Sequence, residues 1–333
     1  MNTRRRLVLV GAALTAILAS SNASAQTSST EPAWPTRAVR LVVPSPPGTA
    51  PDIVARIVGD RLARMWGQPV VVENRPGAGG LVAFTAMKGT ERDDHQFAFT
   101  PASSVTLSAY MYKSSNVSIA RDLVPVAFIG ESPMVLAVSS TSPFNSLGEL
   151  LAAARQNPDT LVVASPLEYS VPHLTTDMLS RSSGARLRAI PFAGSTQSST
   201  AVVAGDAQIV IDGLPPLDGM IKGKRLKMLA TFSSTRLPGL PNVPAVAETY
   251  PDMVVNGWFG VFALNGMSRG IIDKVNRDVS AIIVLPDVKA QFEQLALFSR
   301  PLSVEQFGSY LGRERARWEK ALQDVGAQPV TQQ

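Results

Sequence analysis

The 333-residue chain contains no cysteine. Disulfide bonds, thiolate metal sites and a lipid attached to an N-terminal cysteine are therefore excluded. Histidine is nearly absent too: only His95 and His173 occur, without an HxxxH spacing, so we expect no metal and no cofactor. Charged residues make up 17% of the chain and apolar residues 45%, which is typical of a globular rather than a disordered protein.

No segment after the N-terminus is long and apolar enough to cross a membrane. Residues 1–25 begin with the basic MNTRRR, continue with the 13-residue apolar run LVLVGAALTAILA and end in Ala23-Ser24-Ala25. A membrane-spanning helix needs about 20 apolar residues. The three-part pattern therefore predicts a cleaved signal peptide rather than an anchor. We expect a mature protein that begins at Gln26 and is located in the periplasm.

The export signal also accounts for most of the basic character of the chain. Loss of Arg4, Arg5 and Arg6 leaves 28 of the 31 basic residues against 26 acidic ones. The mature net charge is then only about +2, which gives no indication of a nucleic-acid partner.

Strands and helices alternate after a lead-in at residues 26–33. Short β-branched runs predict strands, and apolar residues at helical spacing predict the helices between them. This alternation is typical of a parallel sheet covered by helices. The elements expected in this first part are strands 38–43, 70–74 and 96–100 and helices 52–66 and 81–88.

A long apolar run at 123–140 is interrupted by Gly130 and Pro133, and we expect it to leave one lobe and enter another. A similar run at 254–264 would return to the first lobe before two closing amphipathic helices. The prediction is an α/β fold with two lobes joined by two crossing strands around a central cleft. The expected lobes are residues 26–131 with 254–333, and residues 132–253. The second lobe should contain helix 146–156 and strands 160–165, 187–192, 207–213 and 226–232.

The segment SPPGTAPD, residues 45–52, lies between the first strand and the first helix. Pro51 fits the first helical position, and Asp52 suits the positive end of the helix. We hypothesise that the loop keeps the amides of Gly48 and Thr49 free to bind an anion such as a carboxylate. The alternative, which spacing alone favours, is an ordinary strand-to-helix turn with a capping aspartate.

The remaining motifs indicate binding more than catalysis. ENRPGAGG, residues 73–80, lacks the Lys-Ser/Thr pair of a phosphate loop. A hydrolase using a serine, His173 and Asp212 stays open as an alternative, although no Gly-x-Ser-x-Gly elbow is present. The serine-rich segments 100–104 and 194–200 follow predicted strands and can supply neutral hydrogen bonds. These features indicate an exported two-lobed binder of a small anionic molecule.

Several strings resemble one known family. They are WPTRAVRLVVPSPPGTAPDIVARIVGDRL, GQPVVVENRPGAGG, PHL, IPFAG, GDAQIVIDG and LPNVPAVAETYPDMVVNGWFG, and the likeness covers residues 34–330. The chain resembles the Bug-type substrate-binding proteins of tripartite tricarboxylate transporters. The resemblance implies a type II periplasmic-binding-protein fold in a monomer that is not an enzyme. It also implies capture of a dicarboxylate, amino acid or aromatic acid for membrane permease subunits, or, as an alternative, presentation of the ligand to a signalling receptor.

The resemblance also implies which residues bind the ligand. They are Gly48, Thr49, Ala50, Asp52, Thr100, Ala102, Ser103, Ser104, Ser165, Glu168, Tyr169, Ser170, Gly194, Ser195 and Asp212. The chain departs from the family pattern at Thr49, where a glycine is usual, and at Ala193, where a longer residue is common. Leu167, Glu168 and Tyr169 replace small residues in the loop before PHL, so the selectivity of this chain should differ from its relatives.

Overall fold

The strand that runs through the middle of the sheet is unusually long. A computed structural model describes residues 34–89, 93–113, 117–324, 326–327 and 329–331, so the expected signal peptide lies outside the described residues. In it the whole apolar run forms β5 (Leu123–Ser139), 17 residues without a break. The run therefore forms one strand, as expected, and passes through Gly130 and Pro133. Both residues are accommodated within the strand, and Pro133, which has no N–H to donate, pairs with Asn256 of β10 (Asn256–Leu264).

The main sheet is parallel towards both ends and antiparallel in the middle. Its order is β2-β1-β3-β10-β5-β8-β6-β7, and β9 and β11 also pair with β5. β10 runs antiparallel to both β3 and β5, whereas β1 is parallel to β2 and β3. The strands not yet given bounds are β1 (Val39–Val43), β2 (Val70–Asn74), β3 (Gln96–Pro101), β6 (Val162–Ser165), β7 (Arg188–Pro191), β8 (Ile209–Gly213), β9 (Leu226–Thr231) and β11 (Phe298–Ser299).

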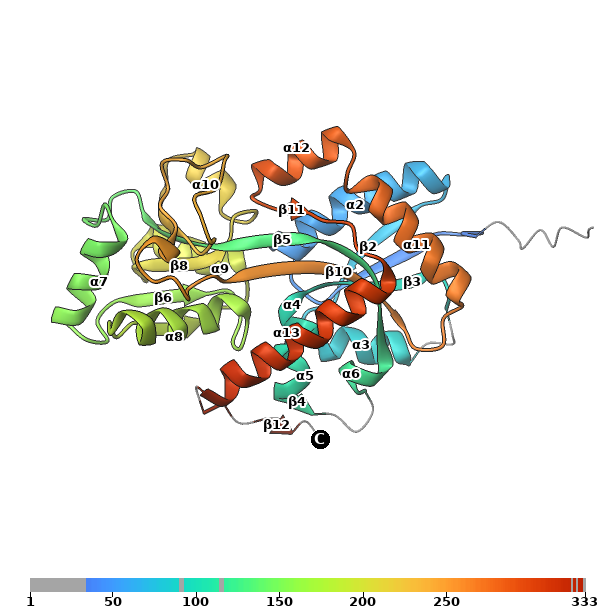
Figure 1. Ribbon diagram of the computed structural model, residues 1–333, viewed down its shortest axis with the longest axis horizontal. Coiled ribbons are helices and arrows are strands. Elements are labelled where there is room, and N and C mark those ends of the chain that lie inside the picture. The colour runs from blue at the N-terminus through green and yellow to red at the C-terminus, as the bar shows by residue number, and fades with distance from the viewer. Residues whose placement is uncertain (1–33, 90–92, 114–116, 325, 328, 332–333) are drawn as a thin grey trace, which may run out of the picture. The chain divides into compact units, whose positions relative to one another are not determined.

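Helices follow most strands, as the alternation predicts. Figure 1 shows β5 and β10 side by side between two groups of elements: the first group consists of the elements before β5 and after β10 in the chain, and the second group consists of those between β5 and β10. The helices are α2 (Ala50–Trp66), α3 (Leu81–Lys88), α4 (Ala102–Val105), α5 (Leu107–Met111), α6 (Ile119–Asp122), α7 (Leu147–Gln156), α8 (Val171–Ser183), α9 (Ser195–Ala204), α10 (Asp218–Lys222), α11 (Arg269–Ile282), α12 (Pro286–Gln294) and α13 (Val304–Asp324). The 3-10 turns η1 (Ala78–Gly80) and η2 (Val246–Glu248) and the small pair β4 (Tyr112–Lys113) with β12 (Val330–Thr331) complete the described elements.

Three helices, not the expected two, follow β10. Pro286 near the start of α12 separates it from α11. The last helix, α13, begins with a capping box: Ser303 Oγ accepts from the Gln306 N–H at 3.2 Å, and Gln306 Oε1 accepts from the Ser303 N–H at 2.9 Å. No helix in the described part of the chain has the length and hydropathy that a membrane span requires.

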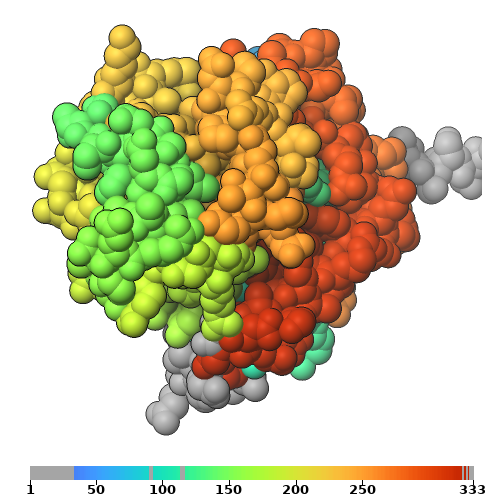
Figure 2. Space-filling view, turned by 60° about the vertical axis from the view of Figure 1, so that its left-hand side comes forward, coloured from blue at the N-terminus to red at the C-terminus, as the bar shows by residue number. Residues whose placement is uncertain are grey.

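α13 anchors the crossing strands through one buried carboxylate. Trp258 of β10 and Trp318 of α13 both donate their indole N–H to Glu314 Oε2, at 3.0 and 3.1 Å. Phe307 packs edge-on against Trp258, and Arg317 donates to the Val254 carbonyl at 2.9 Å. In the space-filling view, the orange segment that precedes β10 lies against the red surface of α13 (Figure 2). The C-terminal helix therefore supports the strand pair that carries the site.

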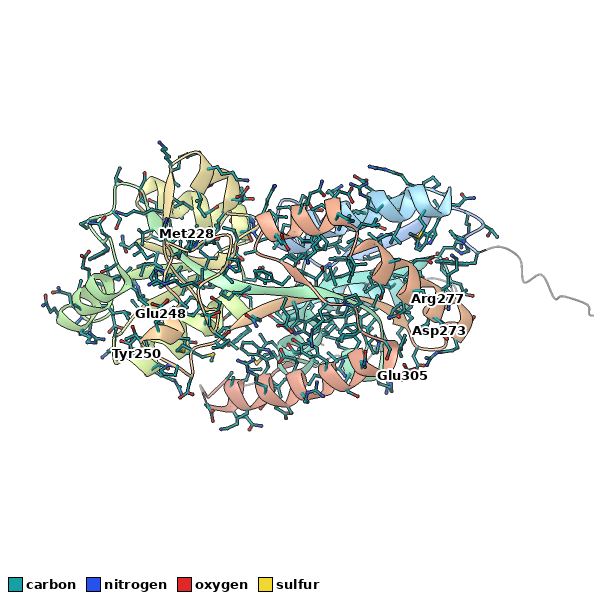
Figure 3. The ribbon with its side chains drawn as sticks, turned by 45° about the horizontal axis from the view of Figure 1, so that its top comes forward. Met228, Glu248, Tyr250, Asp273, Arg277 and Glu305 are labelled. Atoms are coloured by element: carbon teal, nitrogen blue, oxygen red, sulfur yellow. The ribbon has the colours of Figure 1, made fainter. Side chains whose placement is uncertain are left out.

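Polar contacts also link elements within each group. In the second group Arg155 donates to the Tyr250 hydroxyl at 3.0 Å, and Arg236 pairs with Glu248 at 2.8 Å. In the first group Arg269 pairs with Asp273 and with Glu305. The labelled side chains of Glu248 and Tyr250 lie near one another, and those of Asp273 and Glu305 lie near one another elsewhere (Figure 3).

Candidate functional site

A cavity of about 80 Å³ lies where the ends of several strands and the starts of several helices meet. Both crossing strands contribute to it, through Ser132 and Met134 of β5 and Gly257 to Phe259 of β10. The lining contains no Lys, Arg or His among the described residues, and its one acidic side chain is Asp212. The lining residues are Ser45, Thr49, Ala50, Pro51, Pro101, Ala102, Ser103, Ser132, Met134, Pro166, Leu167, Ser170, Val171, Pro172, Ser195, Asp212, Gly213, Gly257, Trp258 and Phe259.

Two helix N-termini border this cavity without a side-chain cap. α2 begins after Thr49 and α9 after Gly194, and in neither case does the side chain of the preceding residue accept an N–H from the first turn. α8 differs, because Ser170 Oγ accepts from the His173 N–H at 3.3 Å. Uncapped first turns present amide donors at the positive end of the helix macrodipole. The site can therefore neutralise an anion with backbone groups.

The SPPGTAPD loop is more constrained than the sequence indicates. The Gly48 N–H donates to Asp52 Oδ2 at 2.9 Å, and the Thr49 N–H lies 3.4 Å from the Pro46 carbonyl. The prediction that these two amides stay free is wrong, because the Asp52 side chain accepts from the Gly48 N–H and the Pro46 carbonyl accepts from the Thr49 N–H. The helix also begins at Ala50, so Pro51 is its second residue. Of this loop, Ser45 and residues 49–51 line the cavity.

Asp52 is the centre of a network behind this loop. Its Oδ1 accepts from Arg56 at 2.8 Å and from Asn74 at 3.0 Å, and Asn74 also donates to the Ser45 carbonyl at 3.0 Å. Burial raises the pKa of Asp52, but the bonds from Arg56, Gly48 and Asn74 outweigh it and hold the pKa below its ordinary value. Asp52 therefore fixes the loop, as expected, and is absent from the cavity lining.

The loop touches the start of α9 on the other side of the cavity. A methyl group built on Gly194, whose φ is 142°, would lie 3.4 Å from Pro46 Cγ and 3.7 Å from Thr49 Cγ2. A methyl group built on Gly48, whose φ is 78°, would lie 3.4 Å from Thr196 Oγ1. Both positions have a positive φ, which L side chains rarely adopt and which explains the two glycines.

Asp212 lies at the end of β8 and is only 5% exposed. Its Oδ1 accepts from the Gly213 N–H at 2.8 Å, whereas Oδ2 has no hydrogen-bond partner among the described residues. Burial raises the pKa of this carboxyl to about 6, against the lowering effects of Ser195 and the Gly213 N–H. The hydroxyl of Ser132, 1% exposed, also has no partner among the described residues. Two buried polar groups thus face the cavity without partners.

The serine next to His173 does not form a triad with Asp212. Ser165 Oγ lies 3.1 Å from His173 Nδ1, but the Asp212 side chain accepts from the Gly213 N–H. Ser165 is fully buried and is not part of the cavity lining. Burial lowers the pKa of His173. The tilted ring of Tyr169 lies 6.2 Å from the imidazole, so this pair serves packing at the start of α8.

A second cavity, of about 180 Å³, adjoins the first. The two share Ser45, Pro101, Ser103, Leu167 and Ser170 in their linings. Glu168 and Tyr169 line the second cavity together with Tyr112 and the glycine turn at 77–79. Tyr169 has a φ of 50°, a conformation that is strained for a bulky side chain.

The sequence-predicted residues fall into three groups. Seven line the first cavity: Thr49, Ala50, Ala102, Ser103, Ser170, Ser195 and Asp212. Three line only the second: Ser104, Glu168 and Tyr169. Five line neither: Gly48, Asp52, Thr100, Ser165 and Gly194.

Residues of the crossing strands, Ser132, Met134, Trp258 and Phe259, were missed. These residues lie where the sequence predicts the two crossings between lobes, and a position at a crossing is the feature that could have identified them as cavity residues. Among the described residues no group of three or more His, Asp or Glu could hold a metal ion.

Comparisons with known proteins give one family. Residues 54–326 match the model of the tripartite tricarboxylate transporter family receptor. A protein encoded in the tcbD–tcbE intergenic region of Pseudomonas sp. strain P51 is 32% identical over 96% of this chain and 94% of its own. The protein BugT of Bordetella pertussis is 29% identical over 98% of this chain and 99% of its own.

Solved structures agree with the fold. Rpa4515 of R. palustris, solved with adipate, has a TM-score of 0.85 and 28% identity, covering 89% of this chain and all of that one. MatC of Rhodopseudomonas palustris, solved with malate, has a TM-score of 0.79 and 27% identity, covering 87% of this chain and all of that one. The expected family resemblance and the type II periplasmic-binding-protein fold are confirmed.

Replacing Asp52 should measure how much the loop network contributes. We expect Asp52→Ala to lower the free energy of unfolding by about 1–3 kcal/mol at pH 7, because the Gly48 N–H and the Asn74 amide lose their acceptor. Asp52→Asn should cost less, since its side-chain oxygen can still accept. Urea unfolding measures both, and Asp324→Ala, which breaks an exposed pair with Lys320, is the control with an expected change of about 0.5 kcal/mol or less.

The stabilisation that Asp52 contributes should depend on pH. The folded pKa of Asp52 is lowered, so its stabilisation is present above the unfolded pKa of about 4 and is lost as the pH falls further. The gap between wild type and Asp52→Ala should shrink at pH 3. A gap that is equal at pH 3 and pH 7 would contradict an ionised Asp52.

Proposed function

Because the chain belongs to the tripartite tricarboxylate transporter receptor family, we propose that it is a periplasmic solute-binding protein that captures a small carboxylate and delivers it to the permease subunits of such a transporter. The observation that carries the proposal is the pair of uncapped helix N-termini, of α2 and α9, on one cavity that lacks cationic side chains. Backbone amides bind a carboxylate reversibly, and reversibility suits capture and release.

The ligand class follows from the lining and from the relatives. Met134, Leu167, Val171, Trp258 and Phe259 give the cavity an apolar wall, which suits the carbon body of a carboxylate. Relatives solved with adipate and malate support a four- to six-carbon diacid as the first candidate.

The best test is a thermal-shift panel on protein recovered from the periplasm, with an intact mass that corresponds to a chain beginning at Gln26. The panel contains malate, adipate, amino acids and aromatic acids, with the neutral diamides of the two diacids as controls. A ligand at about 100 times its dissociation constant should add about 2.7 kcal/mol to the free energy of unfolding. Stabilisation by the diamides but by none of the acids would contradict carboxylate capture.

We also propose that the two groups of elements move as bodies, residues 26–131 with 254–333 and residues 132–253, about hinges near 130–133 and 255–258. The polar contacts within each group support the proposal that each group moves as a rigid body. β5 and β10 connect the two groups, so the two hinges lie on these strands. Contact between the 46–49 loop and the start of α9 would then belong to the closed form.

Ligand should therefore reduce the radius of gyration. Gly48→Val should prevent this compaction and weaken binding, because its side chain would meet Thr196. Gly67→Val is the matched control: Gly67 also has positive φ, 64°, but nothing lies within 4 Å of an added methyl group. Small-angle scattering with and without a saturating panel ligand decides the matter, and superimposable profiles for the wild type would contradict closure.

Selectivity should depend on the second cavity. Glu168 and Tyr169 line it together with Tyr112, so replacing Glu168 and Tyr169 by glycine should change the ranking of panel ligands, with the largest effect on aromatic and amine-bearing acids. Lys224→Gly, which relieves a positive φ of 54° away from both cavities, controls for backbone relief. An unchanged ranking in the double variant would place both residues outside ligand recognition.

A further inference from the structure

The charge balance of the first cavity presents a problem for a carboxylate ligand. The lining residues include no Lys, Arg or His, and they include the carboxyl group of Asp212. A ligand carboxylate would therefore share a dehydrated space with a second carboxyl group and no side-chain cation. Two carboxylates that share a buried site do not both remain ionised, and one of them takes up a proton.

Asp212 lies in the same part of the cavity lining as the start of α2 and Ser132. Gly213, the next residue, lies close to both Ala50 and Ser132: a methyl group built on Gly213 would be 4.0 Å from Ala50 Cβ and 3.8 Å from Ser132 Oγ. Ala50 is the first residue of the uncapped α2. The Oδ2 of Asp212 and the hydroxyl of Ser132, both without a partner among the described residues, thus belong to the same cavity lining as the first residue of α2.

No other charged group resolves the conflict. α8 packs on β8 and carries His173, Asp177 and Arg181, and Asp177 interacts with both of the others. β5 carries Glu131, which pairs with Arg300 at 2.9 Å. α9 and β6 carry no titratable side chain. Desolvation and two hydrogen bonds, without any charged partner, set the titration of Asp212, whose pKa is about 6.

We propose that Asp212 takes up one proton from solvent as the carboxylate binds and then donates its Oδ2–H to a ligand oxygen. Asp212 is then a specificity-determining residue for acceptor groups. The Gly213 N–H continues to bond Oδ1, so the acid is held in one orientation. A ligand that presents an ammonium group at this point would need the ionised form instead and would bind with the opposite pH dependence. The inference rests on the proposed carboxylate capture.

Calorimetry with malate and adipate between about pH 6.5 and 8.5 tests it, because the ligand carboxylates stay ionised over that range. The wild-type affinity should fall as the pH rises, approaching tenfold per pH unit at the alkaline end. Buffers of different ionisation enthalpy should report up to one proton taken up per ligand bound.

Asp212→Asn is the decisive variant, since its amide can accept from Gly213 and donate to the ligand at every pH. We expect it to bind malate or adipate at pH 8.5 at least as tightly as the wild type, without pH dependence and without proton uptake. Ser132→Ala is the matched control: it loses one hydrogen-bonding group and should bind more weakly but keep the pH slope.

Three results would overturn the inference. They are pH-independent wild-type binding without proton uptake, a loss of tenfold or more in Asp212→Asn at pH 8.5, and an unchanged slope in that variant. The first and third would leave carboxylate capture intact, and the second would indicate a cationic ligand group. Failure of every carboxylate to bind at every pH would overturn the proposed function and this inference together. If Asp212→Asn does not fold, the wild-type proton count decides alone.

Discussion

The antiparallel pairing of β5 with β10 is the interaction on which the rest of the structure depends. Nine residue pairs, from Asn256 with Pro133 to Leu264 with Leu123, join the two strands, with register shifts next to Gly260 and Phe262. The same two strands line one wall of the cavity, here called its floor, and connect the two groups of elements. They also provide the surface to which α13 attaches. A sheet that must serve all three purposes cannot be interrupted in the middle, which explains why β5 passes through Gly130 and Pro133.

The cavity is lined by groups with opposite electrostatic effects on a bound anion. Helix N-termini favour negative charge in the site, whereas the buried carboxyl of Asp212 disfavours it. Asp52 resolves a similar conflict on the other side of the same loop by pairing with Arg56, Asn74 and the Gly48 amide. Asp212 has no such cation among the described residues, and only Ser195 and the Gly213 N–H counteract the effect of its burial. The different surroundings of two buried aspartates thus separate a structural anion from a group that can change its charge.

Local patterns in the sequence predict the fold well and the site only in part. The β-branched runs and capping residues predict β1, β2 and the start of α13 because these elements are decided by near neighbours. The resemblance to the family also points to Ser195 and Asp212, and both residues line the cavity. Gly48 shows the limit: whether its amide is free depends on the rotamer of Asp52 and on Asn74, which reaches it from β2. The contributions of Ser132 and Trp258 depend on strand register between distant segments, which one sequence does not specify.

Trp258 gives the molecule an internal optical reporter. Its indole is fully buried, lines the cavity and shares Glu314 with Trp318, while Phe128 and Tyr310 pack around it. Any change of charge or polarity on the floor of the cavity acts directly on this ring, and through the shared carboxylate on a second one. The emission of the unmodified protein should therefore follow the state of its binding cavity without an added label.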